Sequence, residues 1–239
     1  MIYVMSDIHG CYNEYKQLLE KIQFSEADEM YVLGDVVDRG PEPMKILFDM
    51  MYRPNVYPIL GNHEYMAIKI LGKLNVEIKE DNVDDYLNGD DIEDFMYWMK
   101  DGGQTTVEEF QKLNSEDKEA VLEYLQEFSI YEEVDVKDKK YILVHADIHG
   151  YEDKKMLEDY HLEDFLFYRA EYHKRYFKDE SKILVTGHTP TFTIRTDQKP
   201  LVFNKNGHLA IDCGCVYGGN LAVYCLDNGR VEYVKRKSL

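Results

Sequence analysis

The most informative stretch of this chain is residues 30–40, where the sequence is MYVLGDVVDRG. Its first part, residues 30–33, is a short apolar run of the length typical of a buried strand. Charged side chains follow almost immediately, at Asp35, Asp38 and Arg39. Ligands of open α/β sheets collect outside the carboxyl ends of the strands, so these side chains are predicted to lie at a ligand-binding edge.

The same arrangement, an apolar run that ends in a polar side chain, occurs at four other places. The runs are 2–5, 56–60, 141–144 and 183–186, and the polar residues that follow them are Asp7 and His9, Asn62 and His63, His145, and His188. We expect these side chains to converge on one rim although they are far apart in the sequence. Asp, His and Asn together suit two adjacent divalent cations, and paired cations suit the attack of water on phosphate.

Helical periodicity separates the first three runs. Apolar residues recur at helical spacing after the first run (Tyr15, Leu18, Leu19, Ile22) and after the second (Met44, Leu47, Phe48, Met51). Pro43 suits the first turn of the second helix, and residues 63–71 predict a third helix. This alternation predicts parallel strands joined by right-handed crossovers, with Pro58 unusual inside the third strand.

Residues 75–128 have a different character and are predicted to form a helical insertion over the edge of the site. The acidic residues of its first part are Glu77, Glu80, Asp81, Asp84, Asp85, Asp90 and Asp91, and a solvated face is their simplest explanation. Gly102 and Gly103 are expected to interrupt the helices. Ser115 is expected to cap the last helix, whose apolar face ends at Phe128.

Antiparallel strands are expected in the second half of the chain. Residues 132–136 and 141–144 flank a charged turn at 138–140. Two Asn-Gly pairs, Asn206-Gly207 and Asn228-Gly229, each lie between strand-like runs, and this dipeptide favours tight hairpin turns. The length of 239 residues suits one α/β domain, so residues 1–239 are assigned to a single domain with an insertion at 75–128.

The composition excludes several classes of protein. The chain is 44% hydrophobic and 31% charged, with a formal net charge of −18, which is typical of a globular protein and unsuited to nucleic-acid binding. No stretch has the length and apolarity of a membrane span or of a secretory signal, so no membrane partner is expected. Only four cysteines occur, which indicates a reduced, cytoplasmic setting.

Three motifs together make the chain resemble the metallophosphoesterases. They are Ser6-Asp7-Ile8-His9-Gly10, Gly34-Asp35-Val36-Val37-Asp38-Arg39-Gly40 and Gly61-Asn62-His63-Glu64, followed by His145 and by Gly187-His188-Thr189-Pro190. Within that superfamily the chain resembles the Ser/Thr phosphoprotein phosphatases, most closely the small bacterial and phage lambda-type protein phosphatases. Ser6 stands where that family usually has glycine. The resemblance implies a calcineurin-like α/β (α+β) fold, with two mixed β-sheets packed as a sandwich and flanked by helices.

The resemblance also implies a set of metal ligands, and the residue types agree with it. Asp7 and His9 are expected to bind the first ion, and Asn62, His145 and His188 the second. Asp35 is expected to bridge both ions, since one carboxylate can give an oxygen to each. Mixed oxygen and nitrogen ligands favour Mn²⁺, with Fe, Zn²⁺ or Ni²⁺ as alternatives.

Four further residues are expected to act on the substrate. The resemblance makes His63 the general acid and Asp38 the carboxylate that orients its ring. Arg39 and Arg169 are the expected phosphate-binding residues, because a guanidinium matches two phosphate oxygens. Taken singly, each of these residues has an ordinary structural explanation, such as a helix cap or a surface ion pair; their combination is harder to explain in that way.

The expected function is hydrolysis of phosphoserine and phosphothreonine in proteins, with phosphotyrosine as a further substrate. The hydroxide that bridges two metal ions would attack phosphorus directly, without a phosphoenzyme. The main alternative is a symmetrical bis(5'-nucleosyl)-tetraphosphatase, which shares the same motifs. The acidic charge and Thr189 disfavour a phosphodiesterase. The complete ligand set disfavours a non-catalytic scaffold. The substrate, a phosphoprotein or a small phosphate ester, and the oligomeric state stay open.

Overall fold

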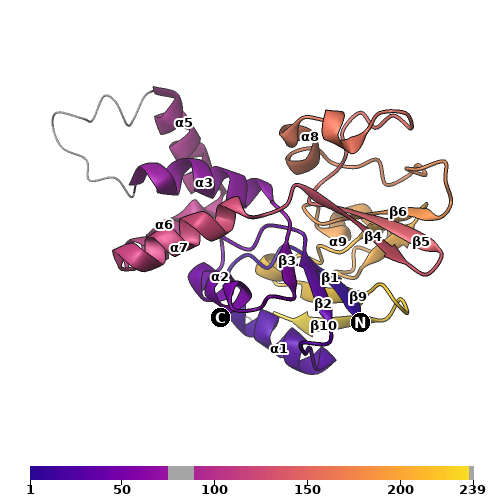
Figure 1. Cartoon of the computed structure of the whole chain (residues 1–239), viewed down its shortest axis with the longest axis horizontal. Helices are drawn as coiled ribbons and strands as arrows, with labels where there is room; N and C mark the ends of the chain where they lie inside the picture. Colours follow the sequence, from indigo (N-terminus) through magenta and orange to yellow (C-terminus); the bar gives the residue numbers. More distant parts are fainter. Residues whose placement is uncertain (75–88, 237–239) are drawn as a thin grey trace.

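The computed structural model describes residues 1–74 and 89–236, which contain two mixed five-stranded β-sheets (Figure 1). The first sheet has the order β10 (Val231–Lys235), β9 (Asn220–Cys225), β1 (Ile2–Met5), β2 (Glu29–Val32) and β3 (Val56–Pro58). The second has the order β4 (Tyr131–Val136), β5 (Lys139–Val144), β6 (Lys182–Thr186), β8 (His208–Ala210) and β7 (Phe203–Lys205). Strands β1, β2 and β3 are parallel to one another, as are β5, β6 and β8, whereas the outer pairings β9–β10, β4–β5 and β7–β8 are antiparallel.

Alternating side chains explain why the two sheets pack as a sandwich. Val4 on β1, Leu143 on β5 and Val185 on β6 belong to one buried cluster that lies between the sheets. Their neighbours Met5 and Val144 belong to a second cluster, which includes the apolar faces of the helices. Successive residues of a strand point to opposite faces, so apolar runs of four residues supply both layers of core. The predicted architecture of two mixed sheets flanked by helices is confirmed.

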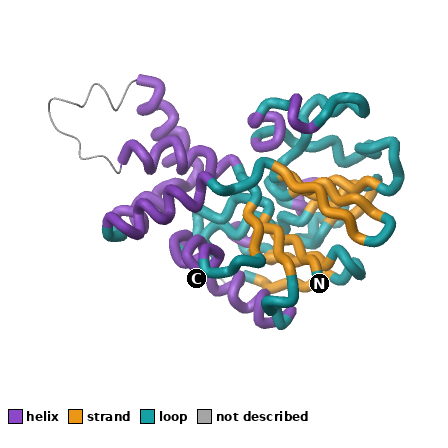
Figure 2. The backbone as a smooth tube through the Cα atoms, in the orientation of Figure 1, coloured by secondary structure: helices purple, strands orange, loops and turns teal. Residues whose placement is uncertain are grey.

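Some helices cover the outer face of the first sheet, and others project away from it as a separate group (Figure 2). The helices between the first three strands and after the third are α1 (Tyr12–Ile22), α2 (Pro43–Met51) and α3 (Asn62–Leu74). Tyr15, Leu18 and Leu19 of α1 are buried, as their spacing predicted, and Pro43 lies in the first turn of α2. Shorter helices lie in the second half: η2 (Leu157–Asp159), α8 (Leu162–Leu166), α9 (Thr191–Ile194) and η3 (Cys215–Tyr217).

The insertion is helical in its described part. It consists of α5 (Gly89–Trp98), the π-helical turn η1 (Met99–Gly103), α6 (Gln104–Gln111) and α7 (Ser115–Gln126), which lie beside α3 in Figure 1. Asn114, and not Ser115, caps α7, because the Asn114 side chain accepts the Asp117 N–H at 2.9 Å. The first acidic residues of the predicted run, Glu77 to Asp85, lie outside the described residues.

Turn chemistry explains the antiparallel strands. Asn206 and Gly207 both have positive φ, 58° and 68°, and join β7 to β8 as the mirror-image turn that this dipeptide favours. The turn between β4 and β5 is shorter than predicted, because strand pairing continues to Lys139 opposite Val136. Pro58 is tolerated because β3 is an edge strand. Among the described residues, no helix is both long enough and apolar enough to cross a membrane.

Candidate metal centre and active site

The six predicted metal ligands lie in loops at the carboxyl ends of strands from both sheets. Asp7 and His9 follow β1, Asp35 follows β2, Asn62 begins α3 after β3, His145 follows β5 and His188 follows β6. The main-chain N–H of His188 lies 3.0–3.1 Å from both carboxylate oxygens of Asp7, which ties the loop of the second sheet to that of the first. The structure therefore brings together all six side chains, which the sequence separates by up to 181 residues.

Strained backbone is concentrated in these loops. Six of the ten predicted site residues have φ between 43° and 71°: Asp7, His9, Asp35, Asp38, Arg39 and His188. Residues other than glycine adopt this region uncommonly, and such conformations cluster at functional sites. The loops also approach each other closely, since a Cβ on Gly34 would lie 2.5 Å from the Cα of Gly61. This contact explains why both of these motifs begin with glycine.

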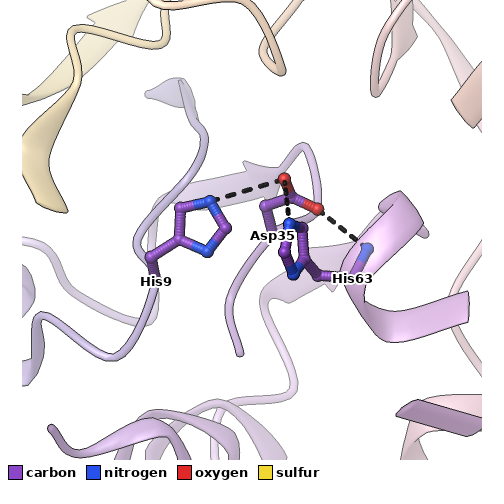
Figure 3. Close-up of side chains that lie close together, drawn as sticks. All are labelled: His9, Asp35 and His63. Atoms are coloured by element: carbon purple, nitrogen blue, oxygen red, sulfur yellow. Dashed lines mark hydrogen bonds and ion pairs between the residues drawn. The ribbon is translucent and has the colours of Figure 1, made fainter. Parts of the chain in front are cut away.

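Asp35 lies between two histidines that approach different oxygens of its carboxylate. Its Oδ2 is 3.5 Å from His9 Nε2, and its Oδ1 is 3.4 Å from His145 Nε2. Figure 3 shows the Asp35 carboxylate next to the His9 and His63 rings. The Nδ1 atoms of His9 and His145 donate to the carbonyls of Val37 and Leu33, at 2.8 and 2.7 Å. Each neutral ring therefore has its lone pair on Nε2, on the side of Asp35.

This arrangement fits a cation on each side of Asp35. Burial lowers the pKa of both His9 and His145, which keeps the rings neutral and able to bind a metal. A lone pair that faces a carboxylate oxygen is favourable only when a cation lies between them. Two donors bound to one ion at about 2.1 Å lie roughly 3.0–3.4 Å apart, close to the separations seen here. Histidines whose Nδ1 is fixed by a carbonyl are also typical of metal sites.

A second group of donors adjoins the Oδ1 side of Asp35. Asn62 Oδ1 lies 2.9 Å from His145 Nε2 and 3.0 Å from His188 Nδ1, and these two nitrogens are 3.1 Å apart. Burial, followed by the charge of His145, lowers the pKa of His188 to about 3. Two neutral imidazoles and an amide oxygen beside a carboxylate form a ligand set suited to a divalent transition metal.

Asp7 is buried among other acids. Burial, then the negative charges of Asp212 and Asp35, raise the pKa of Asp7 well above its usual range. The hydroxyl of Ser6 donates to Asp7 Oδ2, so the serine that replaces the usual glycine both fits and contributes a hydrogen bond. A nearby cation would stabilise this carboxylate.

His63 is fully buried and is held through one ring nitrogen. Its Nδ1 is 2.5 Å from Asp38 Oδ2, and Asp38 also accepts from Trp98 Nε1 at 2.6 Å and from the Thr106 hydroxyl at 2.5 Å. The other nitrogen, Nε2, makes no hydrogen bond in good geometry within the described residues. The nearest acidic oxygen on that side is Asp101 Oδ2, at 3.4 Å. An oriented imidazole with a free N–H is the arrangement a general acid requires.

Arg39 is half-buried and contacts both the site and the insertion. Its Nη1 is 2.6 Å from His9 Nε2, and its Nη2 donates to Asp101 Oδ1 at 3.0 Å. The ring of Tyr217 lies 5.6 Å from the guanidinium. The side chain is thus positioned over the edge of the site, where a phosphate would contact it.

Arg169 is less closely tied to the site. It is exposed and follows α8, and its positive charge contributes to the low pKa of His188. No direct contact between Arg169 and the other candidates is seen among the described residues. Its phosphate-binding role stays a prediction.

A model of the calcineurin-like phosphoesterases matches residues 1–234, which is nearly the whole chain. The chain belongs to the calcineurin-like phosphoesterase family. Metallophosphoesterases of this kind use a dinuclear divalent centre. Among the described residues, two candidate groups share Asp35: His9, Asp35 and His63 form one, and Asp35, His145 and His188 form the other. The expected superfamily is therefore confirmed.

Curated relatives of this calcineurin-like phosphoesterase include symmetrical bis(5'-nucleosyl)-tetraphosphatases. The chain is 33% identical to that of Erwinia tasmaniensis over 113 residues, which is 46% of this chain and 41% of the relative. It is 34% identical to that of Wigglesworthia glossinidia brevipalpis over 101 residues, 41% of this chain and 37% of the relative. The chain thus matches less than half the length of these relatives. They agree better with the tetraphosphatase alternative than with the protein phosphatase expected first.

Solved structures share the fold across several substrate classes. A candidate diadenosine tetraphosphatase matches with a TM-score of 0.63 at 17% identity, over 99% of this chain and 93% of the other. A Ser/Thr phosphatase from Saccharomyces cerevisiae matches with a TM-score of 0.58 at 13% identity, over 100% of this chain and 80% of the other. At these identities the likeness shows the fold alone.

Sequence reasoning missed three residues of the phosphoesterase site on the insertion: Trp98, Asp101 and Thr106. They contact Asp38 and Arg39 across 60 to 68 residues of sequence. Gly102 and Gly103 were predicted only as helix breakers. The carbonyl of Gly102 also accepts the Arg39 N–H at 2.9 Å, in a π-helical turn. Trp98 is the only tryptophan in the chain, and this was the one feature of the sequence that could have drawn attention to it.

Glu64 was also missed as a structural part of the site. Its buried carboxylate accepts the N–H groups of Asp35, Val36, Val37 and Gly61, at 2.7–3.1 Å. These bonds hold the Gly34–Arg39 loop against the start of α3. Glu64 belongs to the Gly61-Asn62-His63-Glu64 motif. The motif was recognised from the sequence, but the structural role of Glu64 was not.

Proposed function

We propose that this calcineurin-like phosphoesterase hydrolyses dinucleoside polyphosphates, and that it cleaves diadenosine tetraphosphate symmetrically. The proposed substrate class rests on the sequence identity of 33–34% to symmetrical bis(5'-nucleosyl)-tetraphosphatases. The site geometry supports the chemistry, since both donor groups adjoin the same carboxylate. Because the match covers less than half of those relatives, the substrate is a proposal about this chain.

The proposed metal ligands are those expected from the sequence. Asp7, His9 and Asp35 would hold one divalent ion, and Asp35, Asn62, His145 and His188 the other. Mn²⁺ is the proposed metal, with Fe, Zn²⁺ and Ni²⁺ as alternatives. When bound, such ions lower the pKa of a water from about 15.7 toward neutrality and so supply a nucleophile for phosphorus.

The protein groups of the proposed mechanism act around that water. His63, oriented by Asp38, would donate its Nε2 proton to the leaving oxygen, because that nitrogen is free and buried. Arg39 would bind the phosphate through two N–H groups. The same His9 lone pair cannot serve both Arg39 and a metal, so we expect Arg39 to turn from His9 toward the phosphate in the loaded enzyme.

Protein phosphatase activity is the second candidate, supported by the motif resemblance. The phosphate-binding chemistry would be the same for both substrates. Only the groups around the phosphate differ, and those contact the loops and the insertion. The proposed cytoplasmic location suits either substrate.

The test is a direct substrate comparison. The purified chain, stripped of metal and reloaded with Mn²⁺, is given diadenosine tetraphosphate and, separately, phosphoserine, phosphothreonine and phosphotyrosine peptides. We expect diadenosine tetraphosphate to have the highest kcat/KM and to yield two molecules of ADP. Formation of ATP plus AMP would contradict the symmetrical cleavage, and faster turnover of a phosphopeptide would contradict the substrate class.

A further inference from the structure

A stripe of side chains on α3 leads away from the candidate metal centre. Asn62 begins the helix, and Tyr65 and Met66 follow it at the spacing that puts residues on one face of a helix. Lys69 and Ile70 continue the same face one turn later. One turn rises about 5.4 Å, so Tyr65 is one turn and Lys69 two turns from a proposed metal ligand.

This stripe forms one wall of a cavity of about 240 Å³. Three aromatic rings line it: Tyr65 on α3, Tyr97 on α5, and Phe167 after α8. Tyr65 and Phe167 pack edge to face, with ring centroids 6.0 Å apart. Tyr97 is 61% exposed, so one face of the aromatic group remains open to a ligand.

The second wall also leads to the site. Phe167 is two residues before Arg169, the second predicted phosphate-binding residue. The cavity is thus bordered on one side by the helix that carries Asn62 and on the other by Phe167. A phosphate at the metal centre would place the next part of its substrate at the entrance of this cavity.

We propose that this cavity binds the purine base of a nucleotide whose phosphate chain lies at the metal centre, an inference that rests on the proposed function. Sites for whole drug-sized ligands occupy about 300–1,000 Å³, so a cavity of 240 Å³ suits a fragment such as one base. Aromatic side chains bind bases by stacking. A separation of one to two helical turns from Asn62 leaves room for a ribose between the base and the reacting phosphate.

The charged side chains at the cavity form a pair, which suits an uncharged base. Lys69 Nζ lies 4.5 Å from the centroid of the Tyr65 ring and 3.8 Å from Asp94 Oδ2. The ion pair joins α3 to α5 and so helps hold Tyr97 at the cavity. Because Asp94 also lines the cavity, this wall is locally neutral in a chain whose net charge is −18.

The test uses Tyr97→Ala, with Tyr97→Phe as the variant that keeps the ring. Both are compared with Tyr52→Ala, which removes a tyrosine that is 84% exposed and at the end of α2. With Mn²⁺-loaded enzyme, we expect Tyr97→Ala to raise the KM for diadenosine tetraphosphate about tenfold, the cost of one stacked base. Its kcat/KM for p-nitrophenyl phosphate should stay within about twofold, and Tyr97→Phe and Tyr52→Ala should behave as wild type. Equal losses on both substrates, or no loss on either, would overturn the proposal.

A binding measurement separates this inference from the proposed function. Calorimetric titration of the metal-loaded wild type with AMP and with ribose 5-phosphate needs no turnover. We expect AMP to bind about tenfold more tightly, and this preference to disappear in Tyr97→Ala. Equal binding of both ligands by the wild type would overturn the base site, whichever substrate is hydrolysed. Preferential AMP binding without hydrolysis of diadenosine tetraphosphate would sustain the base site and reject the proposed reaction.

Discussion

Asp35 occupies the central position among the site side chains. Its two carboxylate oxygens approach different histidines, at 3.5 Å for His9 and 3.4 Å for His145. Although burial raises the pKa of Asp35, its electrostatic interactions with the surrounding imidazoles, His145 first, outweigh burial and lower that pKa. The carboxylate therefore stays ionised in a buried position, as a bridging ligand must.

Replacement of Asp35 by Asn tests the bridge. The amide keeps the shape of the side chain but loses the negative charge and one acceptor oxygen. We expect the bound metal to fall from about two ions per chain to one or none, and activity to fall by more than about 100-fold, since even an outer-shell change costs 10–100-fold. Metal analysis by mass spectrometry alongside a turnover assay checks both, and a fully loaded, active variant would exclude the bridging role.

His63 has a different predicted role from its neighbour Asn62, although they are adjacent in the chain. Its Nδ1 is bound by Asp38, which leaves only Nε2 for the substrate. A general acid matters most when the leaving group is a poor one.

Substitution of His63 by Asn should therefore leave metal content unchanged and slow turnover by about 10²–10⁴-fold for alkyl phosphates. The loss should be much smaller for p-nitrophenyl phosphate, whose leaving group needs no proton. A series of aryl and alkyl phosphates measures this dependence. The same loss for every leaving group would count against proton donation by His63.

At the level of elements, the start of α3 and the loop after β2 form one unit. Glu64 joins them by accepting four main-chain N–H groups, three of which belong to the Gly34–Arg39 loop. A buried carboxylate is well suited to accept that many donors. The helix thus holds the backbone conformation that points the site side chains inward.

Glu64→Gln should destabilise the protein by roughly 2–3 kcal/mol, because an amide NH₂ would face main-chain donors in place of an acceptor. Urea unfolding at pH 7 measures the change in the free energy of unfolding. Glu20→Gln, an exposed site on α1, is the matched control and should change stability by less than about 0.5 kcal/mol. Similar stabilities for the two variants would show that the loop does not depend on Glu64.

The pair α1 and α2 is joined by a charged cluster away from the site. Asp49 accepts from the Tyr15 hydroxyl at 3.0 Å, from Lys16 at 2.8 Å and from Arg53 at 2.6 Å. Burial raises the pKa of Asp49, but the hydrogen bonds from Arg53 and Lys16 outweigh it and lower that pKa. A lowered carboxyl pKa stabilises the folded state above the unfolded value of about 3.9, and this stabilisation is lost as the pH falls through the folded value.

Asp49→Asn is therefore expected to cost about 0.5–1.5 kcal/mol at pH 7, a value reduced for the partial exposure of the cluster. The difference from wild type should shrink as the pH falls below about 3.9. Urea unfolding at several pH values checks the trend, with Asp138→Asn in the exposed β4–β5 turn as the control. A pH-independent difference would show that the Asp49 charge is not responsible.

At the level of the whole molecule, the site lies where the two sheets and the insertion meet. Loops from the first sheet provide Asp7, His9 and Asp35, and loops from the second provide His145 and His188. Buried acids, with Asp212 beside Asp7, repel one another across this junction. Cations bound there would relieve that repulsion and link both sheets.

Removal of metal is accordingly expected to destabilise the whole fold. Saturation at 100 times the dissociation constant stabilises a protein by about 2.7 kcal/mol, which for a chain of this size corresponds to a Tm increase of roughly 5–10 °C. Calorimetric scans with Mn²⁺ and with EDTA measure it. Equal Tm values would show that these residues bind no ion in the folded state.

The first three strands and helices and the antiparallel hairpins were predictable from local sequence, whereas the parallel pairing of β5, β6 and β8 was not. The roles of the candidate site residues stay predictions. Each of these features can be recognised from a few neighbouring residues: the end of a strand, a glycine where two loops touch, and a side chain of a type that binds metal. Backbone conformation and coordination chemistry both act over that short range. The contacts of Trp98, Asp101 and Thr106 with Asp38 and Arg39 left no such signal, since 60 to 68 residues separate the partners and only packing of the insertion joins them. The aromatic cavity between α3, α5 and Phe167 depends on the same packing, so it became visible only in three dimensions.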